Sequence, residues 1–380
     1  MTAAGIATVA RHEFRLRIRA GRWRRLLVAW FVVLLAFTLL LRSGLEAAGE
    51  ATVGTELRRG AVMYGGLMLF LLALALLVVP ALAAQSVNGD RERGILATLQ
   101  VTRLSAAELT LGKFAAAWGT ALVFLAASAP LVLWSMAEGG VPVGRVLIVT
   151  GVVAILLGTV VALSLALSAV LSRTSTSSVL SYLSVFALTA GTLVLFGLVT
   201  AVTVEEYQQS SYSHSCYGEA APVPLEPAPA PTGTGSTQPP PVPPPPAFPT
   251  GECKEESETY TATRPRTDRT WWLLAPNPFV VLADAAPTTG RFGYSKDDQG
   301  RVELDPLGAL GDTVRDLRLR PVDEPPSALL SSSPPVERKG KPVWPLGLAV
   351  TVLLAVGALA LTVARLRTPS RNLPRGQRVA

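Results

Sequence analysis

Six long apolar runs, separated by polar and basic segments, organise the chain. A helix that crosses a bilayer needs about 20 consecutive apolar residues, and all the runs but the first meet that length. The first run is shorter, so its flanking arginines must reach outward to the membrane surfaces. We therefore predict an all-α integral membrane protein with about six transmembrane helices. The predicted spans are 26–41, 61–86, 114–136, 146–171, 179–204 and 343–364.

The segments between these runs divide the chain further. A short polar turn at 172–178 predicts that the fourth and fifth spans form an antiparallel hairpin. The long segment 205–342 includes the Pro-rich stretch 221–249, which favours polyproline II and partial disorder over a packed core. The predicted order is an amphipathic entry helix at 1–25, five spans within 26–204, the long segment, the sixth span at 343–364 and a basic tail at 365–380.

Composition and charge support a membrane protein and set its orientation. Hydrophobic residues make up 49% of the chain and charged residues 16%, which is too apolar for an ordinary soluble domain. The net charge of +7 does not point to nucleic acid, because the basic residues gather at the ends of the apolar runs. We expect a multi-pass protein with both termini in the cytoplasm and segment 205–342 outside. Arg42 rather than a small-residue cleavage site follows the first run, so we expect that span to be retained.

The stretch before the first span has the pattern of an interfacial helix. Apolar residues such as Phe14 recur among arginines that include Arg11 and Arg15, with Glu13 between them. Such a helix can lie in the membrane interface with its cations on anionic lipid headgroups. Membrane lipid is therefore one expected partner.

The loop between the second and third spans, 88–113, is also amphipathic. Leucines and one isoleucine alternate there with charged residues. Ser105 is followed three residues later by Glu108, which fits a capping box. We predict one helix ending before about residue 103 and a second beginning near Ser105 and continuing into the third span.

This loop carries a family resemblance. The stretch DRERGILATLQVTRLSAAELTLGK, at 90–113, resembles the segment E-R-E-x-G-T-L-x-x-L-x-x-[ST]-P-[LV]-S-x-x-E-[IL]-x-x-G-K of ABC transporter permeases of the type-2 exporter class. Val79 and Pro80 before the loop, the N-terminal VARHEFRLRIRAGRWRR and the hairpin sequence LSAVLSRTSTSS resemble the same family. The resemblance covers about residues 5–204 and the last span. Arg103 departs from it, since the family often has proline there.

The resemblance implies a partner and a role for the loop. In such permeases this loop docks on a separate ATPase subunit, which would hold ATP and Mg²⁺, and a second permease subunit, identical or different, completes the transporter. The carried-over coupling residues are Asp90, Arg91, Glu92, Arg93 and Gly94, with Glu108 as the helix cap. For the arginines alone, orientation by the positive-inside rule is an equally good explanation. The implied location is a bacterial cytoplasmic membrane.

Motifs and charged residues that the sequence lacks exclude several classes of function. No G-x-x-x-x-G-K-[ST] phosphate loop occurs, because Gly112 and Lys113 are followed by Phe114 and Ala107 stands where the first glycine should be. We therefore expect a transport subunit that is not itself an enzyme and holds no cofactor. The spans from the second onward, as delimited above, contain no charged residue or histidine, which favours an amphipathic or lipid-like cargo over an ion.

Two features of segment 205–342 are candidate structural sites. Cys216 and Cys253 are the only cysteines; with His214 they offer too few ligands for a metal, so a disulfide is the stronger interpretation. Trp271 and Trp272 begin an apolar stretch, 271–282, that is short and twice broken by proline, so we expect it at the outer membrane interface. A lid over a cargo exit is the sharper alternative.

Two function classes remain in competition. The first is the permease subunit of an exporter, driven by a separate ATPase. The second is a non-transporting membrane scaffold or sensor that binds a surface partner through its Pro-rich outer segment. An intramembrane enzyme is disfavoured because the spans lack polar catalytic groups.

Overall fold

The structure, a computed structural model, describes residues 2–19, 22–51, 57–92, 94, 105–216, 253–286, 294–296, 302–320 and 340–367. The chain divides into two compact units. Unit 1 comprises residues 1–203, 266–320 and 337–380, and unit 2 comprises residues 204–265 and 321–336. Each unit is described separately below.

Among the residues that the structure describes, unit 1 contains six helices that are long and apolar enough to cross a membrane, as predicted. Three of them are interrupted: a short helix follows the second span, a proline-started helix completes the third, and a π-helix lies inside the fifth. The helices are α2 (Arg22–Ala51), α3 (Arg59–Ala83) followed by α4 (Asn88–Glu92), α6 (Ala106–Ala127) with α7 (Ala129–Ala137), α8 (Val143–Val170), α9 (Thr174–Phe186) with η1 (Ala187–Gly191) and α10 (Thr192–Val202), and α14 (Trp344–Leu366).

The helices extend beyond the apolar runs that predicted them. The first run, 26–41, is short, yet α2 has 30 residues and is about 45 Å long at 1.5 Å per residue. The third run begins at Phe114, whereas α6 begins at Ala106 and so includes Lys113. The fourth begins at Val146, whereas α8 includes Arg145. Lys113 therefore lies on the helix that was predicted to begin near Ser105, and Arg145, which was expected outside the fourth span, lies on the spanning helix α8.

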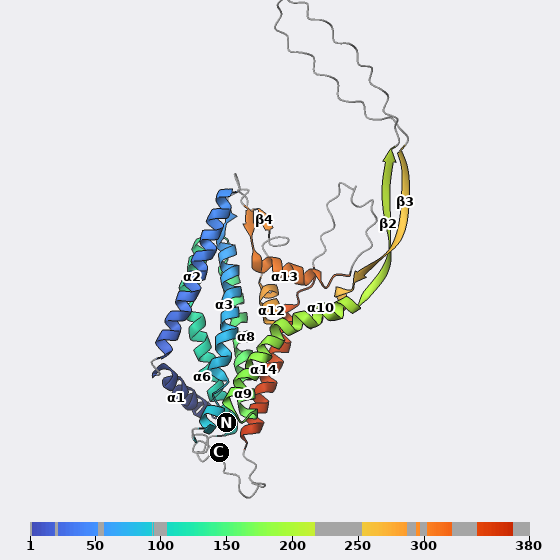
Figure 1. Ribbon diagram of the computed structural model, residues 1–380. Coiled ribbons are helices and arrows are strands. Elements are labelled where there is room, and N and C mark those ends of the chain that lie inside the picture. Colours follow the sequence, from blue (N-terminus) through green and yellow to red (C-terminus); the bar gives the residue numbers. More distant parts are fainter. Residues whose placement is uncertain are drawn as a thin grey trace, which may run out of the picture. The chain divides into compact units, whose positions relative to one another are not determined.

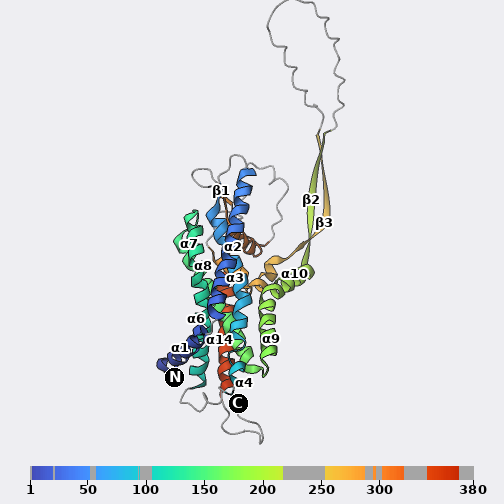
Figure 2. The same cartoon turned by 60° about the vertical axis from the view of Figure 1, so that its left-hand side comes forward.

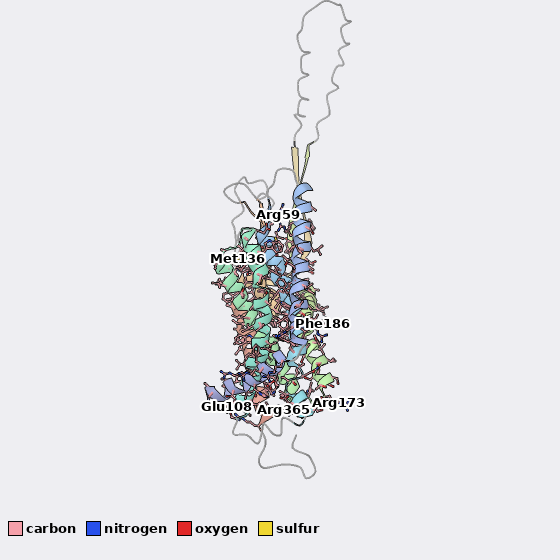
Figure 3. The ribbon with its side chains drawn as sticks, turned by 90° about the vertical axis from the view of Figure 1, so that its left-hand side faces the viewer. Arg59, Glu108, Met136, Arg173, Phe186 and Arg365 are labelled. Atoms are coloured by element: carbon pink, nitrogen blue, oxygen red, sulfur yellow. The ribbon has the colours of Figure 1, made fainter. Side chains whose placement is uncertain are left out.

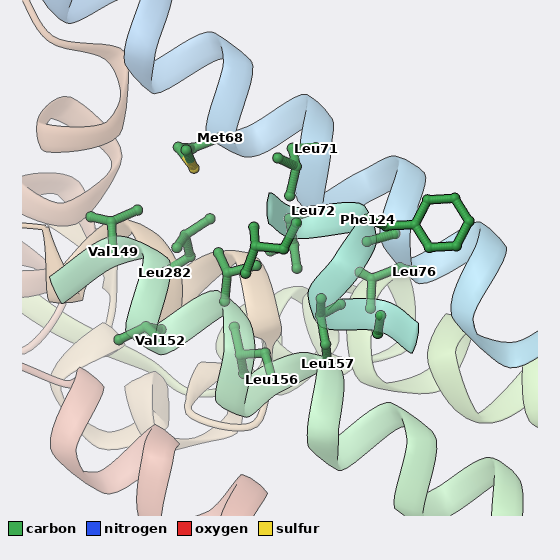
Figure 4. Packing of buried hydrophobic residues seen from close by; sticks show 14 of the residues in the cluster. Met68, Leu71, Leu72, Leu76, Phe124, Val149, Val152, Leu156, Leu157 and Leu282 are labelled. Atoms are coloured by element: carbon green, nitrogen blue, oxygen red, sulfur yellow. The ribbon is translucent and has the colours of Figure 1, made fainter. Parts of the chain in front are cut away.

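Three of the six spans form the centre of unit 1. Half or more of the apolar windows of α3, α6 with α7, and α8 are buried, whereas those of α2, α9 to α10 and α14 are at most 22% buried. The central cluster includes Leu72 of α3, Phe124 of α6 and Leu157 of α8 (Figure 4). The peripheral helices present their remaining apolar surface outward, as expected of helices in lipid.

The two ends of unit 1 can be named by the elements they hold. The α1 end holds α1 (Ala3–Arg19), α4, the turn between α8 and α9 and the end of α14 (Figures 1 and 2). Val9, Leu109 and Leu366 share one buried cluster there, so both ends of the described chain meet at the same end. The α13 end holds α7 and α13 (Pro306–Asp316). In Figure 3, Glu108 and Arg365 mark the α1 end and Met136 the α13 end.

Part of segment 205–342 belongs to unit 1 and is folded. It forms α11 (Thr267–Thr270), the 3₁₀ helix η2 (Trp271–Leu274), α12 (Pro278–Ala285) and α13. A small sheet has the strand order β1 (Leu57–Arg58), β5 (Val302–Leu304), β4 (Tyr294–Lys296). The apolar stretch 271–282 does not span, but its second half is not at a surface either: Val281 and Leu282 are fully buried, and Leu282 packs among the spans (Figure 4).

Unit 2 contains a long antiparallel β-hairpin that the sequence analysis did not predict. Strand β2 (Val204–Cys216) pairs with β3 (Cys253–Pro265) in unbroken register from Val204 opposite Pro265 to Cys216 opposite Cys253. The all-α prediction therefore holds for the spans, and the structure adds strands outside them. The Pro-rich stretch 221–249 lies outside the described residues.

Candidate functional site

A buried lysine joins three elements at the α1 end of unit 1. Lys113 lies two turns into α6, and its side chain is 1% exposed. Its ammonium group donates to Glu13 Oε1 of α1 at 2.5 Å, to Asp90 Oδ2 of α4 and to the carbonyl of Ser86 at 3.2 Å. The three donors of the ammonium group are thus all used. We call Lys113, Glu13 and Asp90 the Lys113 cluster.

Charge in this cluster is balanced by a second cation. Arg17, one turn beyond Glu13 on α1, is half-buried and donates from Nη1 to the carbonyl of Leu82 at 3.4 Å. Partial burial lowers the pKa of Arg17, and the nearby charges of Glu13 and Asp90 oppose that shift. Two cations therefore face two carboxylates. Because an unpaired buried charge is costly, the cluster holds α1 and α4 in fixed positions on α6.

The carboxylate of Glu108 fixes the beginnings of two helices. Its Oε2 accepts from Ser105 N at 2.8 Å while Glu108 N donates to Ser105 Oγ at 3.2 Å, which is the predicted capping box. Its Oε1 also accepts from Thr2 N at 2.5 Å and from Thr2 Oγ1 at 2.9 Å. The same side chain thus starts α6 and holds the beginning of α1 beside it.

Close packing completes this contact between α1 and α6. A side-chain carbon at Gly112 would lie 2.5 Å from Cβ of Val9, so only glycine allows the two helices to approach this closely. Gly5 likewise faces the Glu108 carboxylate. The GK pair at the end of the resembling stretch therefore has a structural use: Gly112 admits α1, and Lys113 binds it.

The predicted coupling residues separate into inward and outward positions. Asp90 faces Lys113. Arg91 Nη1 donates to the carbonyl of Leu171 at 3.3 Å, and Glu92 Oε1 accepts from Thr174 N at 3.4 Å, so both meet the turn between α8 and α9. Glu92 and Gly94 are exposed, and Gly94 has a φ of 71°, a left-handed turn that suits glycine. Arg93 and residues 95–104 lie outside the described part of the chain.

The predicted interfacial residues of α1 also separate. Arg11 and Arg15 are exposed and line an open groove together with His12. Glu13 and Phe14 are half-buried, and Glu13, on the side of the helix opposite to this groove, meets Lys113. One face of α1 is therefore basic and open, and the other is bound to α6.

The remaining predicted sites lie elsewhere. The Arg318 guanidinium carbon stands 4.1 Å from the ring centre of Trp271, and Trp272 is 55% exposed. Cys216 and Cys253 are register partners at the end of the hairpin, and their side chains are outside what the structure describes. The disulfide stays a prediction.

A second buried ion pair, at the α13 end, was not predicted. Arg145 Nη2 of α8 lies 2.6 Å from Asp305 Oδ1, at the start of α13, and both side chains are fully buried. Among the described residues, Arg145 Nε and Nη1 and the Tyr64 hydroxyl have no hydrogen-bond partner.

One sequence signal could have indicated the Lys113 cluster: Glu13 is the only acidic residue in 1–25. We find no comparable signal for Arg145.

Comparison with known proteins adds no identification. No family model, no curated protein and no solved structure matches this chain.

Proposed function

We propose that this chain is the permease subunit of an ATP-driven exporter, of the ABC type-2 kind that the stretch 90–113 resembles. The observation that carries the proposal is the Lys113 cluster. It binds the loop after α3 to α1 and to the beginning of α6, at the end of unit 1 where both described chain ends lie. A partner that pulls on this loop would therefore move three helices together.

The proposal assigns the α1 end to the cytoplasm of a bacterial cell. The exposed residues Glu92 and Gly94 form the docking surface for a separate ATPase subunit that holds ATP and Mg²⁺. The resemblance of stretch 90–113 adds Arg93 to the coupling residues. Asp90 serves instead to hold the loop, because it is buried against Lys113. The exposed arginines of α1 rest on anionic lipid headgroups. A second permease subunit completes the transporter.

The distribution of charge supports an amphipathic or lipid-like cargo. Two cations are fully buried on the central spans, Lys113 near one end of unit 1 and Arg145 near the other, and each faces a carboxylate. Between them, the cluster around Leu72 and Leu157 is apolar. A charged solute would meet no compensating charge over that depth, whereas a hydrocarbon chain would need none.

Affinity purification of the full chain from its native membrane tests the proposal. The tagged wild-type chain is expected to bring down a protein that carries a phosphate loop and hydrolyses ATP, identified by mass spectrometry. Lys341→Glu changes a charge at an exposed position at the α13 end, away from the loop after α3. This control variant should bring down the same partner as the wild type. If no ATPase accompanies either protein, the transport proposal fails.

A second candidate function is a surface scaffold, and unit 2 is the observation that favours it. Its strands are long and hydrogen-bonded, yet they are rich in Ser, Thr, Glu and Gln and belong to no spanning element. Such a ribbon could present the Pro-rich stretch 221–249 to a partner. Deleting 221–249 distinguishes the two: the permease keeps its ATPase, and the scaffold loses its partner.

A further inference from the structure

The fifth span contains a π-helix that is bound by a side chain from outside the spans. The π turn η1 (Ala187–Gly191) carries an extra residue and interrupts the regular helical ladder between α9 and α10. Asn277, just before α12, donates from Nδ2 to the Thr189 carbonyl and to Thr192 Oγ1, each at 2.9 Å. π turns inside helices are frequent at functional sites.

Asn277 uses both ends of its amide. Its Oδ1 accepts from Phe279 N at 2.9 Å and from Val280 N at 3.4 Å, which caps the beginning of α12. The side chain is 1% exposed. Because α12 is itself buried against α8 and α14, a movement of the fifth span away from Asn277 would be a movement away from the centre of unit 1.

A small apolar cavity lies beside this contact. It is lined by Leu188 of η1, Pro276 and Pro278 on either side of Asn277, Leu156 of α8 and Thr351 of α14. The π turn and the Asn277 segment thus form part of its wall. The cavity is too small for a cargo as it stands, so the surrounding helices must separate before anything larger enters.

The fifth span is the least buried of the six. Only 11% of its apolar window is buried, and Phe186, next to the π turn, is 59% exposed (Figure 3). Hydrogen bonds from Ser177 and Tyr182 hold its first half to α3 and the following residues, and a bond between Thr200 and Thr270 holds its far end. Asn277 binds its middle. An element with few buried contacts opens more readily than a central one.

We propose that Asn277 is a latch that keeps the fifth span closed over this cavity, and that its release opens a lateral gate to the bilayer. The use of the gate, entry of the hydrocarbon part of a cargo, rests on the proposed transport function. The latch itself does not, because opening can be measured on the permease alone. A π turn suits a gate, since it already lacks regular helical hydrogen bonding at the point of movement.

Two variants test the latch role of Asn277 while keeping the helix cap of α12. Asn277→Ser keeps a good helix cap for α12 but is too short to reach Thr189. Thr192→Val keeps the shape of the π turn and removes one of the two acceptors. Asn277→Ala, which removes both cap and latch, completes the set.

The experiment measures how often lipid reaches the cavity. Each full-chain variant is reconstituted in phosphatidylcholine vesicles that contain a phosphatidylcholine with a diazirine on its acyl chain, illuminated without nucleotide, and mapped by mass spectrometry. Asn277→Ser loses both hydrogen bonds to the fifth span and should raise labelling near Leu156, which is 2% exposed, by on the order of 25-fold, about fivefold for each bond. Labelling at Phe186 should stay constant.

Equal labelling near Leu156 in the wild type and in folded Asn277→Ser would overturn the latch. If Asn277→Ser does not fold, Thr192→Val carries the same test, and unchanged labelling there has the same meaning. Because no ATPase is present, a negative result leaves the proposed transport function standing. Conversely, failure to find an ATPase partner would not remove the gate.

Discussion

The ammonium nitrogen of Lys113 lies 2.5 Å from Oε1 of Glu13, a residue one hundred positions earlier in the chain. The lysine side chain is 1% exposed and also faces Asp90. Through this contact an N-terminal helix, a loop between spans and a spanning helix become one structural element.

Replacing the cation should therefore loosen the α1 end. Lys113→Met removes the cation that contacts the carboxylates of both Glu13 and Asp90, and we expect it to reduce the free energy of unfolding by about 3 kcal/mol, the cost typical of breaking a buried pair. Lys113→Arg should lose less, because it keeps the charge. Thermal unfolding in detergent measures both, with Arg11→Gln on the exposed face of α1 as control. Equal melting temperatures for Lys113→Met and the wild type would show that the pair contributes nothing.

Removing the Glu108 carboxylate should free the beginning of α1. Glu108→Ala takes away the acceptor used by Ser105 and Thr2, and we expect the free energy of unfolding to fall, because one half of the capping box is lost. Hydrogen exchange of the α1 amides should become faster in this variant. Glu108→Gln keeps the shape and should show a smaller change. Protection of α1 that does not differ from the wild type would mean that the Lys113 cluster and the packing at Gly112 hold the helix without Glu108.

The Arg145–Asp305 pair should behave as a coupled unit. Asp305→Asn leaves Arg145 buried without a counter-charge and should destabilise the chain by about 3–5 kcal/mol. The double variant Arg145→Met with Asp305→Leu removes both charges and should be more stable than Asp305→Asn alone. A double-mutant cycle, measured by denaturant unfolding, gives the coupling energy. If the effects of the single variants Arg145→Met and Asp305→Leu add up to the effect of the double variant, the pairing is contradicted.

The hairpin register makes the predicted disulfide geometrically suitable. Residues directly opposite each other in an antiparallel pair have Cα atoms about 4.5–5.5 Å apart, within the range that a disulfide bridges. Mass spectrometry of an unreduced digest should find a peptide that links Cys216 to Cys253, and the link should be absent from Cys216→Ser. Two thiols that both react with maleimide in the denatured, unreduced chain would exclude the bond.

The six spans could be predicted because hydrocarbon thickness fixes the length of an apolar run, and nothing else in the sequence competes with that signal. The capping box at Ser105 and Glu108 could be predicted for a similar reason, since its contacts are local. Lys113 was placed on a helix, because the helix from Ser105 was expected to continue into the third span, but its partners Glu13 and Asp90 were not predicted. Arg145 could not be placed, because a charge beside an apolar run looks the same in a loop and on a helix that continues past the run.

Contacts between segments that lie far apart in the chain also could not be predicted from the sequence. The hairpin of unit 2 has polar residues on both faces, so no alternation of apolar positions indicated strands. The apolar stretch that includes Leu282 was expected at an interface because two prolines break it, yet α12 fits between the spans once Asn277 and Pro278 begin it. The π turn at Thr189 leaves no signal in a uniformly apolar run.

The most direct test of the central claim, that the loop after α3 couples this chain to an ATPase, is a charge swap in this loop that spares the buried Asp90. Glu92→Lys with Arg93→Glu leaves Asp90 and the Lys113 cluster intact, and Lys341→Glu at the α13 end serves as the control. The account predicts that the swapped chain unfolds at the wild-type temperature but retains much less ATPase, and less ATP hydrolysis, after purification from native membranes. Full retention of the ATPase by the folded, swapped chain would contradict it.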